Sequence, residues 1–509
     1  MFLIVLLGQD NATVYQDSMP RIPASPPSIL LIMTDQQALH TLSCYGAPVA
    51  RSPRIDALAA DGIRFDHACT PSALCTPARA SLLTGLYPHA HGVRFNTGVF
   101  SRWDETACGR GLTLFPGKLA AAGYRLGHQG KWHAGLTRTA TEAGFTGFSL
   151  PDYGGIRSDP TFLHYLQEHG LPQPRPHFEF SAEGGDPTRS GGNTSGWAEG
   201  DIRSSPCHFV TEQVLAQLDD FAAGDAPFFI GCHFWEPHAP YLPTEDFKDL
   251  YNPGDIPEWP SFRDDLRHRP QWHRRFQEKI FPGAASTAWP DWARVIARYY
   301  AQAAMVDHEI GRLLDGLRER GIYDDTLIVF ASDHGESIGI HGGMFDKGGL
   351  AHEELYRIPL VIKPPHAAAA IRGRVCTEWV SLIDLAPTFC AVAGTDLAAV
   401  HGRDLGPLLR GETPPDWRDD MLAQDHGHRV MFLERILWHQ NWKYVFNPSD
   451  TDELYDLATD PAELHNRIDD PSVYARACAM RLRLRARLQE VNDELGPQAL
   501  KLLDPPGQP

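Results

Sequence analysis

Short runs of consecutive apolar residues alternate along most of the chain with segments whose apolar residues recur at helical spacing. A strand buried on both faces is apolar throughout, whereas a helix that covers a sheet is apolar along one stripe. The alternation therefore predicts an α/β fold, with a large, mainly parallel sheet sandwiched by helices. Strands are expected at 28–33, 124–127, 227–232, 326–331 and 358–363, and helices at 55–62, 113–122 (with Thr113 as N-cap), 209–221 and 295–320.

Two long segments, 158–206 and 247–290, interrupt this alternation, and the first is rich in Gly, Pro, Ser and His. Loops of this length in a compact domain are usually functional rims or mobile lids. We therefore expect them to form surface excursions that contribute walls to a binding pocket.

The pattern changes after about residue 424. Hairpin strands are expected at 430–439 and 442–447, followed by a strand at 453–457 and a charged helix at 473–495. This order indicates a small α+β unit. The predicted organisation is a leader or flexible segment at 1–25, a catalytic domain at 26–424 and a C-terminal antiparallel-sheet plus helix domain at 425–509.

The composition of the chain argues against several classes of protein. The 509 residues include 46 Lys and Arg against 64 Asp and Glu, a formal charge of −18, which argues against nucleic acid as a ligand. No apolar run approaches the roughly 18 residues of a membrane-spanning helix, so no membrane span is predicted. The nine cysteines form no CxxC pair, which argues against a disulfide framework and a thiolate zinc site.

The first eight residues, MFLIVLLG, are apolar but lack the basic residues that open a secretory signal. The prediction is therefore a cytoplasmic protein, and a periplasmic or secreted protein is the alternative if this leader is a signal peptide. The oligomeric state is left open, a homo-oligomer included.

Ionisable side chains follow several of the expected strands, at or near the point where each strand ends. The carboxyl ends of parallel strands meet at one edge of a sheet, which is where ligands bind in open α/β folds. We therefore expect these side chains to converge on a single site. They are Asp35 and Gln36 after strand 28–33, Lys131 and His133 in GKWHAG, His238 in WEPHAPY, and Asp333 and His334 in SDHGE.

Asp35, Asp333, His334 and the Gln36 amide form an oxygen-rich set with one nitrogen. Such a set suits one hard or borderline divalent cation, Ca²⁺, Mg²⁺ or Mn²⁺. It is too small for two metal ions.

The sequence CTPARASLLTG at 75–85 contains the pattern CxPxR. With its surroundings it resembles the type I sulfatase family of the alkaline-phosphatase superfamily, over about Ser28 to Pro471. The segments that carry the resemblance are SPRIDALAADGIRF (52–65), CTPARASLLTGLYPHAHGV (75–93), GYRLGHQGKWHAG (123–135), PHAPY (237–241), SDHGE (332–336), DKGGLAHEELYRIPLVIK (346–363) and ELYDLATDPAE (453–463).

This resemblance implies that Cys75 is oxidised after translation to formylglycine by a formylglycine-generating enzyme. A hydroxyl of the hydrated aldehyde would attack sulfur, and the second hydroxyl would then expel sulfate and regenerate the aldehyde. Residue 75 would also be a metal ligand. Arg79 would hold the formylglycine and the carboxylates beside the metal.

The same resemblance gives roles to other positions. Lys131 would bridge the formylglycine and the anion, and His133 would accept a proton when sulfate leaves. His238 and Lys347 would contact the sulfate, and one or both would protonate the leaving group. Asn96 would donate a hydrogen bond to a substrate oxygen. His308, in the long helix, is interpreted as structural.

Gln36 departs from the family pattern, because many members have a second Asp there. The loss of one carboxylate weakens the preference of the site for Ca²⁺ and makes Mn²⁺ more credible. A Gln at this position is also similar to the phosphonate monoester hydrolase branch of the family. The predicted function is hydrolysis of a small or aryl sulfate ester, with promiscuity toward phosphonate monoesters and phosphodiesters. The alternatives are a phosphonate monoester hydrolase or phosphodiesterase, and a non-catalytic anion-binding relative if Cys75 stays unmodified.

Overall fold

The computed structural model describes residues 26–97, 111–189, 193–348 and 350–504, so the expected leader at 1–25 lies outside the described residues. Its centre is an eight-stranded sheet with the order β11-β2-β10-β9-β1-β8-β4-β5. The strands are β11 Arg374–Cys376, β2 Ile63–Phe65, β10 Leu360–Lys363, β9 Leu327–Ser332, β1 Ile29–Thr34, β8 Phe228–His233, β4 Arg125–Lys131 and β5 Thr146–Leu150.

Strands β9, β1, β8, β4 and β5 are parallel, and β1 lies at the centre between β8 and β9. β10 is antiparallel to both of its neighbours, β9 and β2. The mainly parallel sheet expected from the apolar runs is thus confirmed, with one reversed strand that the run IPLVIK could not distinguish from a parallel one.

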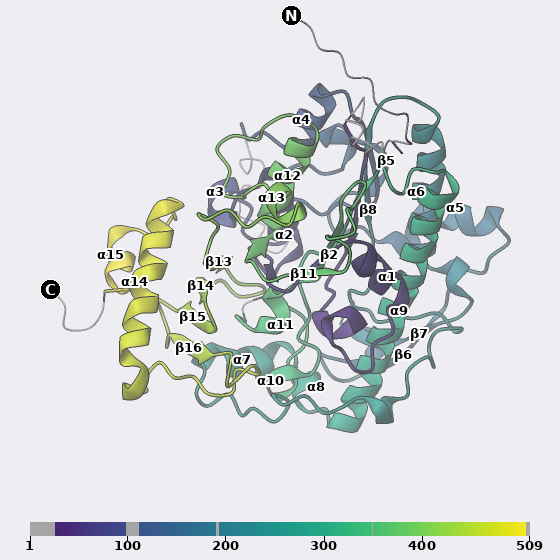
Figure 1. The fold of residues 1–509 in the computed structure, drawn as a ribbon. Coiled ribbons are helices and arrows are strands. Elements are labelled where there is room, and N and C mark those ends of the chain that lie inside the picture. The colour runs from purple at the N-terminus through teal and green to yellow at the C-terminus, as the bar shows by residue number, and fades with distance from the viewer. Residues whose placement is uncertain (1–25, 98–110, 190–192, 349, 505–509) are drawn as a thin grey trace, which may run out of the picture.

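The sheet is covered on both faces, which explains why β1 is apolar at successive positions. Leu30 and Ile32 pack with the helices α1 (Pro53–Asp61), α6 (Pro206–Ala222) and α9 (Trp289–Glu319). Ile29, Leu31 and Met33 pack on the opposite face with α2 (Cys75–Thr84), α4 (Phe115–Ala121) and α12 (Leu385–Val392). Figure 1 shows the sheet between the α1, α6 and α9 layer and the α2, α4 and α12 layer.

Helix α4 begins two residues later than expected. Leu114 occupies the N-cap and makes no side-chain cap hydrogen bond, so the expectation that Thr113 caps this helix is wrong. Pro116 lies in the first turn, where its fixed φ suits the start of a helix.

The two excursions contain regular structure of their own. The first holds α5 (Pro160–Glu168) and an antiparallel pair, β6 (Pro176–Ser181) and β7 (Thr194–Ala198). The second holds α7 (Gln271–Ile280) and α8 (Pro282–Ala285), and α9 begins at its end.

A four-stranded antiparallel sheet forms most of the C-terminal part, in the order β13-β14-β15-β16. One face packs on α14 through residues such as Leu437 and Leu484, and the other packs on the large part of the molecule through Trp438. The expected domain boundary after residue 424 falls inside β13. The elements are β13 Asp420–Asp425, β14 Glu434–His439, β15 Trp442–Phe446, β16 Glu453–Asp456 and α14 Tyr474–Glu490.

The shorter elements are β3 Ala68–Cys69, which pairs with β12 Val380–Ser381, and the helices α3 Pro88–His91, α10 Ile340–Gly343, α11 Glu353–Tyr356, α13 Gly406–Leu409 and α15 Pro497–Lys501. Among the described residues, none of the helices combines the length and the apolar character needed to span a membrane.

Candidate active site

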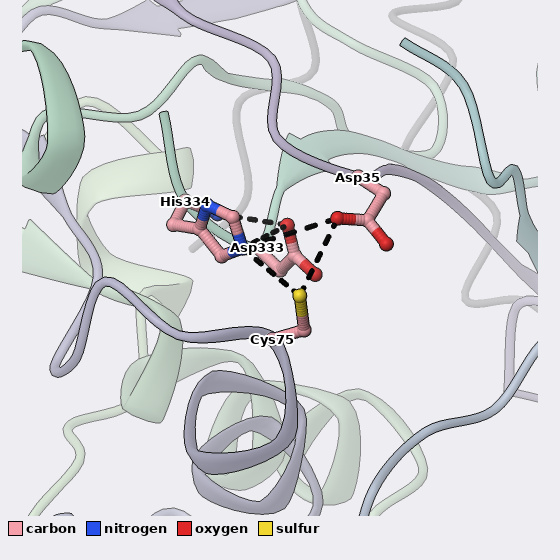
Figure 2. A group of neighbouring side chains, drawn as sticks. All are labelled: Asp35, Cys75, Asp333 and His334. Carbon is pink, nitrogen blue, oxygen red and sulfur yellow. Dashed lines mark hydrogen bonds and ion pairs between the residues drawn. The ribbon is translucent and has the colours of Figure 1, made fainter. Parts of the chain in front are cut away.

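The carboxyl ends of the central strands meet at one edge of the sheet, and the expected ionisable groups gather there. Asp35 follows β1, Lys131 ends β4, and Asp333 with His334 lies at the end of β9. Cys75, at the first position of α2, faces them from the neighbouring helix (Figure 2). Residues hundreds of positions apart in the sequence therefore share one site.

Cys75 is almost fully buried, with 1% of its surface exposed. Its Sγ lies 3.2 Å from His334 Nε2 and 3.7 Å from Asp35 Oδ1. Burial opposes ionisation of the thiol, but the charges of Lys131 and Lys347 outweigh it and hold the pKa of Cys75 well below its ordinary value. A side chain at position 75 is thus placed in a field that favours negative charge.

Asp35, Cys75, Asp333 and His334 form a compact donor group, whose ligand atoms all lie within 4.8 Å of one another. His334 Nδ1 donates to the Gly335 carbonyl at 2.9 Å, which directs Nε2 toward the group. Burial disfavours the charged ring, but Asp333 and Cys75 raise the pKa of His334 to about 9. Surroundings that favour a charged imidazolium also favour a cation, and the oxygen-rich donors suit a hard or borderline one.

Arg79 is buried beside this group. Its Nε donates to Asp333 Oδ2 at 2.9 Å, and its Nη2 lies 3.6 Å from Asp35 Oδ2. Nη1 donates to the Lys131 carbonyl at 3.2 Å. The planar guanidinium thereby fixes both carboxylates relative to the end of β4.

Lys131 and His133 lie on the other side of Cys75. Lys131 Nζ donates to Asp35 Oδ2, and His133 makes a side-chain hydrogen bond with Cys75. Burial, together with the charge of Lys131, lowers the pKa of His133 in spite of that hydrogen bond. The ring is therefore neutral and has a nitrogen that can accept a proton. The ring of Tyr153 covers Lys131, with Nζ 4.1 Å from the ring centroid.

Lys347 and His238 form a second polar group beside the donor group. Lys347 Nζ contacts both His238 Nε2 and the side-chain oxygen of Gln36. His238 Nδ1 donates to the Ala239 carbonyl at 2.6 Å, so Nε2 is the acceptor from Lys347. Burial disfavours the ammonium, but Asp346, at 3.1 Å, raises the pKa of Lys347, which stays charged.

Gln36 is positioned by hydrogen bonds to its backbone and its side chain, and Tyr299 OH donates to its carbonyl at 2.7 Å. Its backbone N donates to Asp333 Oδ1 at 3.0 Å, and its side-chain amide donates to Glu336 and to Asp346. Its side-chain oxygen accepts from Lys347, so Gln36 as a metal ligand stays a prediction.

Asn96 Oδ1 accepts from the Thr76 backbone at 3.0 Å, which holds it beside the first turn of α2. His308 is half exposed on α9, where its Nδ1 lies 3.3 Å from Glu309 Oε1, and its structural role stays a prediction.

Three side chains of this site were not singled out from the sequence: Tyr153, Glu336 and Asp346. Tyr153 OH lies 3.3 Å from His238 Nδ1, and Glu336 and Asp346 accept from Gln36. Glu336 and Asp346 stand inside the motifs SDHGE and DKGG, which could have indicated them. Tyr153 lies in a loop with no comparable signal.

A cavity of about 260 Å³ opens beside His238. Tyr153, Ile156, Trp235 and Pro240 give it largely apolar walls, and Arg157 and Glu236 add charge. Its walls come mainly from the loops after β5 and β8, and the excursion 158–206 contributes only its two ends, Ser158 and Pro206.

A buried group of candidate metal ligands at the start of a helix, at the carboxyl edge of a mainly parallel sheet, is the arrangement expected of a hydrolase of the alkaline-phosphatase type. The chain matches the family model "Sulfatase" over residues 27–395, and the model "N-sulphoglucosamine sulphohydrolase, C-terminal" over 339–493. The chain belongs to the sulfatase family.

Relatives agree with this assignment over most of their length. The uncharacterized sulfatase YidJ of Escherichia coli is 29% identical, over 87% of this chain and 83% of its own. An arylsulfatase of Clostridium perfringens is 27% identical, over 87% of this chain and 90% of its own. The crystal structure of a phosphonate monoester hydrolase of Agrobacterium radiobacter superposes with a TM-score of 0.76 at 25% identity, covering 92% of this chain and 95% of that one.

Proposed function

We propose that this sulfatase cleaves a small or aryl sulfate ester at residue 75, after oxidation of Cys75 to formylglycine by a formylglycine-generating enzyme. The observation that carries the proposal is the position of Cys75, buried at the start of α2 between Lys131, His133 and Lys347 and the acidic donor group. Formylglycine at this position supplies a hydroxyl nucleophile when hydrated.

Asp35, Asp333, His334 and residue 75 would hold one divalent cation, with Ca²⁺ favoured and Mn²⁺ or Mg²⁺ as alternatives. When bound, the cation supplies positive charge that stabilises the negative oxygens of the reacting ester. Arg79 keeps the two carboxylates in place for it.

The remaining side chains bind the anion and move protons. Lys131 and Lys347 surround residue 75 with positive charge, which stabilises the charge that develops on a tetrahedral oxyanion. His133, whose ring has a lowered pKa, accepts a proton from residue 75. His238 and Lys347 stand together on the side of the leaving group, and Asn96 contributes a hydrogen bond to a substrate oxygen.

The cavity beside His238 supports an aryl leaving group. Its apolar walls, which include Tyr153 and Trp235, suit an aromatic ring better than a highly hydroxylated sugar. Its volume of about 260 Å³ limits that group to a small molecule.

A phosphonate monoester hydrolase or phosphodiesterase is the second candidate. It is favoured by Gln36, which replaces a carboxylate beside the metal site, and by the likeness to the Agrobacterium radiobacter enzyme. Sulfate and phosphonate esters are both tetrahedral, so the same side chains serve either substrate.

The test is kcat/KM for a matched pair, 4-nitrophenyl sulfate and 4-nitrophenyl phenylphosphonate. The enzyme is coexpressed with a formylglycine-generating enzyme and assayed in parallel with Ca²⁺ and Mn²⁺. Preference for the sulfate supports the first candidate, and preference for the phosphonate supports the second. An unmodified Cys75 in all natively produced protein, found by mass spectrometry of peptide 65–79, would leave the non-catalytic anion-binding alternative.

A further inference from the structure

A second group of metal-binding side chains lies away from the active site, between α7 and the C-terminal sheet. His273 comes from α7, Glu434 begins β14 and Glu453 begins β16. One ligand atom from each lies within 4.8 Å of the others. At most 1% of each residue is exposed, so water does not solvate them.

Two of the three residues carry polar atoms without a hydrogen-bond partner among the described residues. These are both ring nitrogens of His273 and at least one carboxylate oxygen of Glu434, because the one side-chain hydrogen bond that Trp272 offers cannot satisfy both oxygens. Buried polar atoms nearly always have a partner, because leaving one unsatisfied costs free energy.

The positively charged side chains near this group pair with other carboxylates and leave Glu434 without an ion pair among the described residues. Arg269 is shared between Asp264, at 2.9 Å, and Glu453, at 3.5 Å, and Tyr455 OH also donates to Glu453, at 2.5 Å. Lys443 contacts Glu463 and lies 3.3 Å from Glu353. Glu434 makes no ion pair with either of them in the described part of the chain. An uncompensated buried carboxylate is strongly unfavourable unless it binds a proton or a metal ion.

A neighbouring group with the same chemistry is less suitable. His341, Glu354 and Glu463 also lie within 4.8 Å of one another. His341 Nδ1, however, donates to Asp264 Oδ2 at 2.9 Å and lies 2.8 Å from Arg269 Nη2, and Lys443 forms an ion pair with Glu463. Cationic side chains therefore already contact the potential ligands of the neighbouring group, whereas the ring nitrogens of His273 remain available to bind a metal ion.

We propose that His273, Glu434 and Glu453 bind a structural divalent transition-metal ion, with zinc as the first candidate. One imidazole and two carboxylates are ligands that zinc accepts in proteins, and burial keeps the His273 ring neutral. The ion ties α7, within the excursion 247–290, to two strands of the C-terminal sheet. It is a different site from the one at Asp35, shares no ligand with it and takes no part in the hydrolysis.

A cavity of about 540 Å³ lies beside the neighbouring group and is lined by Glu353, Glu354 and Ile340. The His352 ring contacts both groups, because its centroid lies 4.0 Å from that of His341 and 5.6 Å from that of His273.

The experiment measures tightly bound metal in the whole chain, loaded with zinc and dialysed against metal-free buffer, by plasma mass spectrometry. The Asp333→Asn variant, which disables the active-site cation, is expected to keep one equivalent of zinc. His273→Ala in that background is expected to lose it. X-ray absorption at the zinc edge should show nitrogen and oxygen ligands and no sulfur.

Glu434→Gln is a second variant that preserves side-chain shape, should His273→Ala fold poorly, and it is expected to lose the same equivalent. His308→Ala, an exposed histidine on α9, is the matched control and should leave the zinc content unchanged. Zinc retained in folded His273→Ala and Glu434→Gln, or no zinc in folded Asp333→Asn, would overturn the proposal. Neither result bears on the sulfatase activity, which is assayed separately.

Discussion

Arg79 Nε donates to Asp333 Oδ2 at 2.9 Å across 254 positions of sequence. This pair joins α2, which begins at Cys75, to the end of β9, and both side chains are buried. The proposed nucleophile position and the carboxylates proposed to bind the metal are therefore held in one rigid unit. A change in either partner should affect metal binding and the position of residue 75 together.

Asp333→Asn tests the metal site. The substitution removes a ligand charge and the ion pair with Arg79, so metal affinity should fall by at least about 10-fold. A titration with Ca²⁺ and Mn²⁺ followed by calorimetry measures it. Asp315→Asn, an exposed aspartate paired with Arg318 on α9, is the control and should bind metal as before. Unchanged affinity in Asp333→Asn would remove this residue from the ligand set.

Cys75→Ala tests the nucleophile. Turnover should fall by about 10⁴–10⁶-fold, because the group that becomes the nucleophile is absent, whereas the fold should persist. Cys232→Ala is the matched control, since Cys232 is a fully buried cysteine in the core beside β1. It should lower Tm through a small cavity and keep kcat. Substantial turnover in Cys75→Ala would contradict the covalent mechanism.

His238→Asn separates binding from proton transfer. If His238 protonates the leaving group, kcat should fall by about 10²–10⁴-fold for an alkyl sulfate and much less for 4-nitrophenyl sulfate. The nitrophenolate leaves without a proton, whereas an alkoxide does not. His366→Asn, an exposed histidine paired with Asp325, should change neither rate. Equal losses on both substrates would assign His238 to binding alone.

His91 predicts acid sensitivity of the fold. Burial, followed by neighbouring positive charges, lowers its pKa from 6.5 to about 3. The unfolded chain therefore takes up a proton below pH 6.5 that the folded chain does not bind. The contribution of His91 to the free energy of unfolding is therefore complete above that pH and decreases as the pH falls toward 3. At about pH 5 the loss is about 2 kcal/mol.

The measurement is the free energy of unfolding by urea between about pH 7 and about pH 5. His91→Gln can keep the hydrogen bonds with Ser81 and Val93 but does not titrate, so its stability should fall less steeply. Parallel pH profiles of the two proteins would show that other groups, such as His128 with its pKa of about 3, cause the acid sensitivity.

The sequence carried enough information for the sheet and for the residues that meet at its edge. Apolar runs marked β1, β8 and β9, and the groups that follow them converge as parallel strands require. The antiparallel direction of β10 was not predictable, because an apolar run carries no sign of its direction. The first residue of α4 was also missed, because Leu114 supplies no side-chain cap.

The environment of Gln36 could not be predicted from the sequence. Its amide is held by Glu336 and Asp346, and its oxygen by Lys347, all of which lie about 300 positions away. Tyr153 covers Lys131 from a loop, where no periodicity constrains the position of a side chain. Such contacts depend on how loops pack and not on local pattern.

The burial of Cys75 sets a time limit on its oxidation. In the folded chain the thiol is 1% exposed, and it contacts His334, which lies 259 positions later. At about 5–20 residues per second, a ribosome needs roughly 13–50 s to synthesise the intervening segment. During that interval β9 does not exist and the pocket around Cys75 cannot close. If Cys75 is oxidised as proposed, the modifying enzyme has to act during synthesis or before folding is complete, and the rate of folding then sets the fraction of chains that become active.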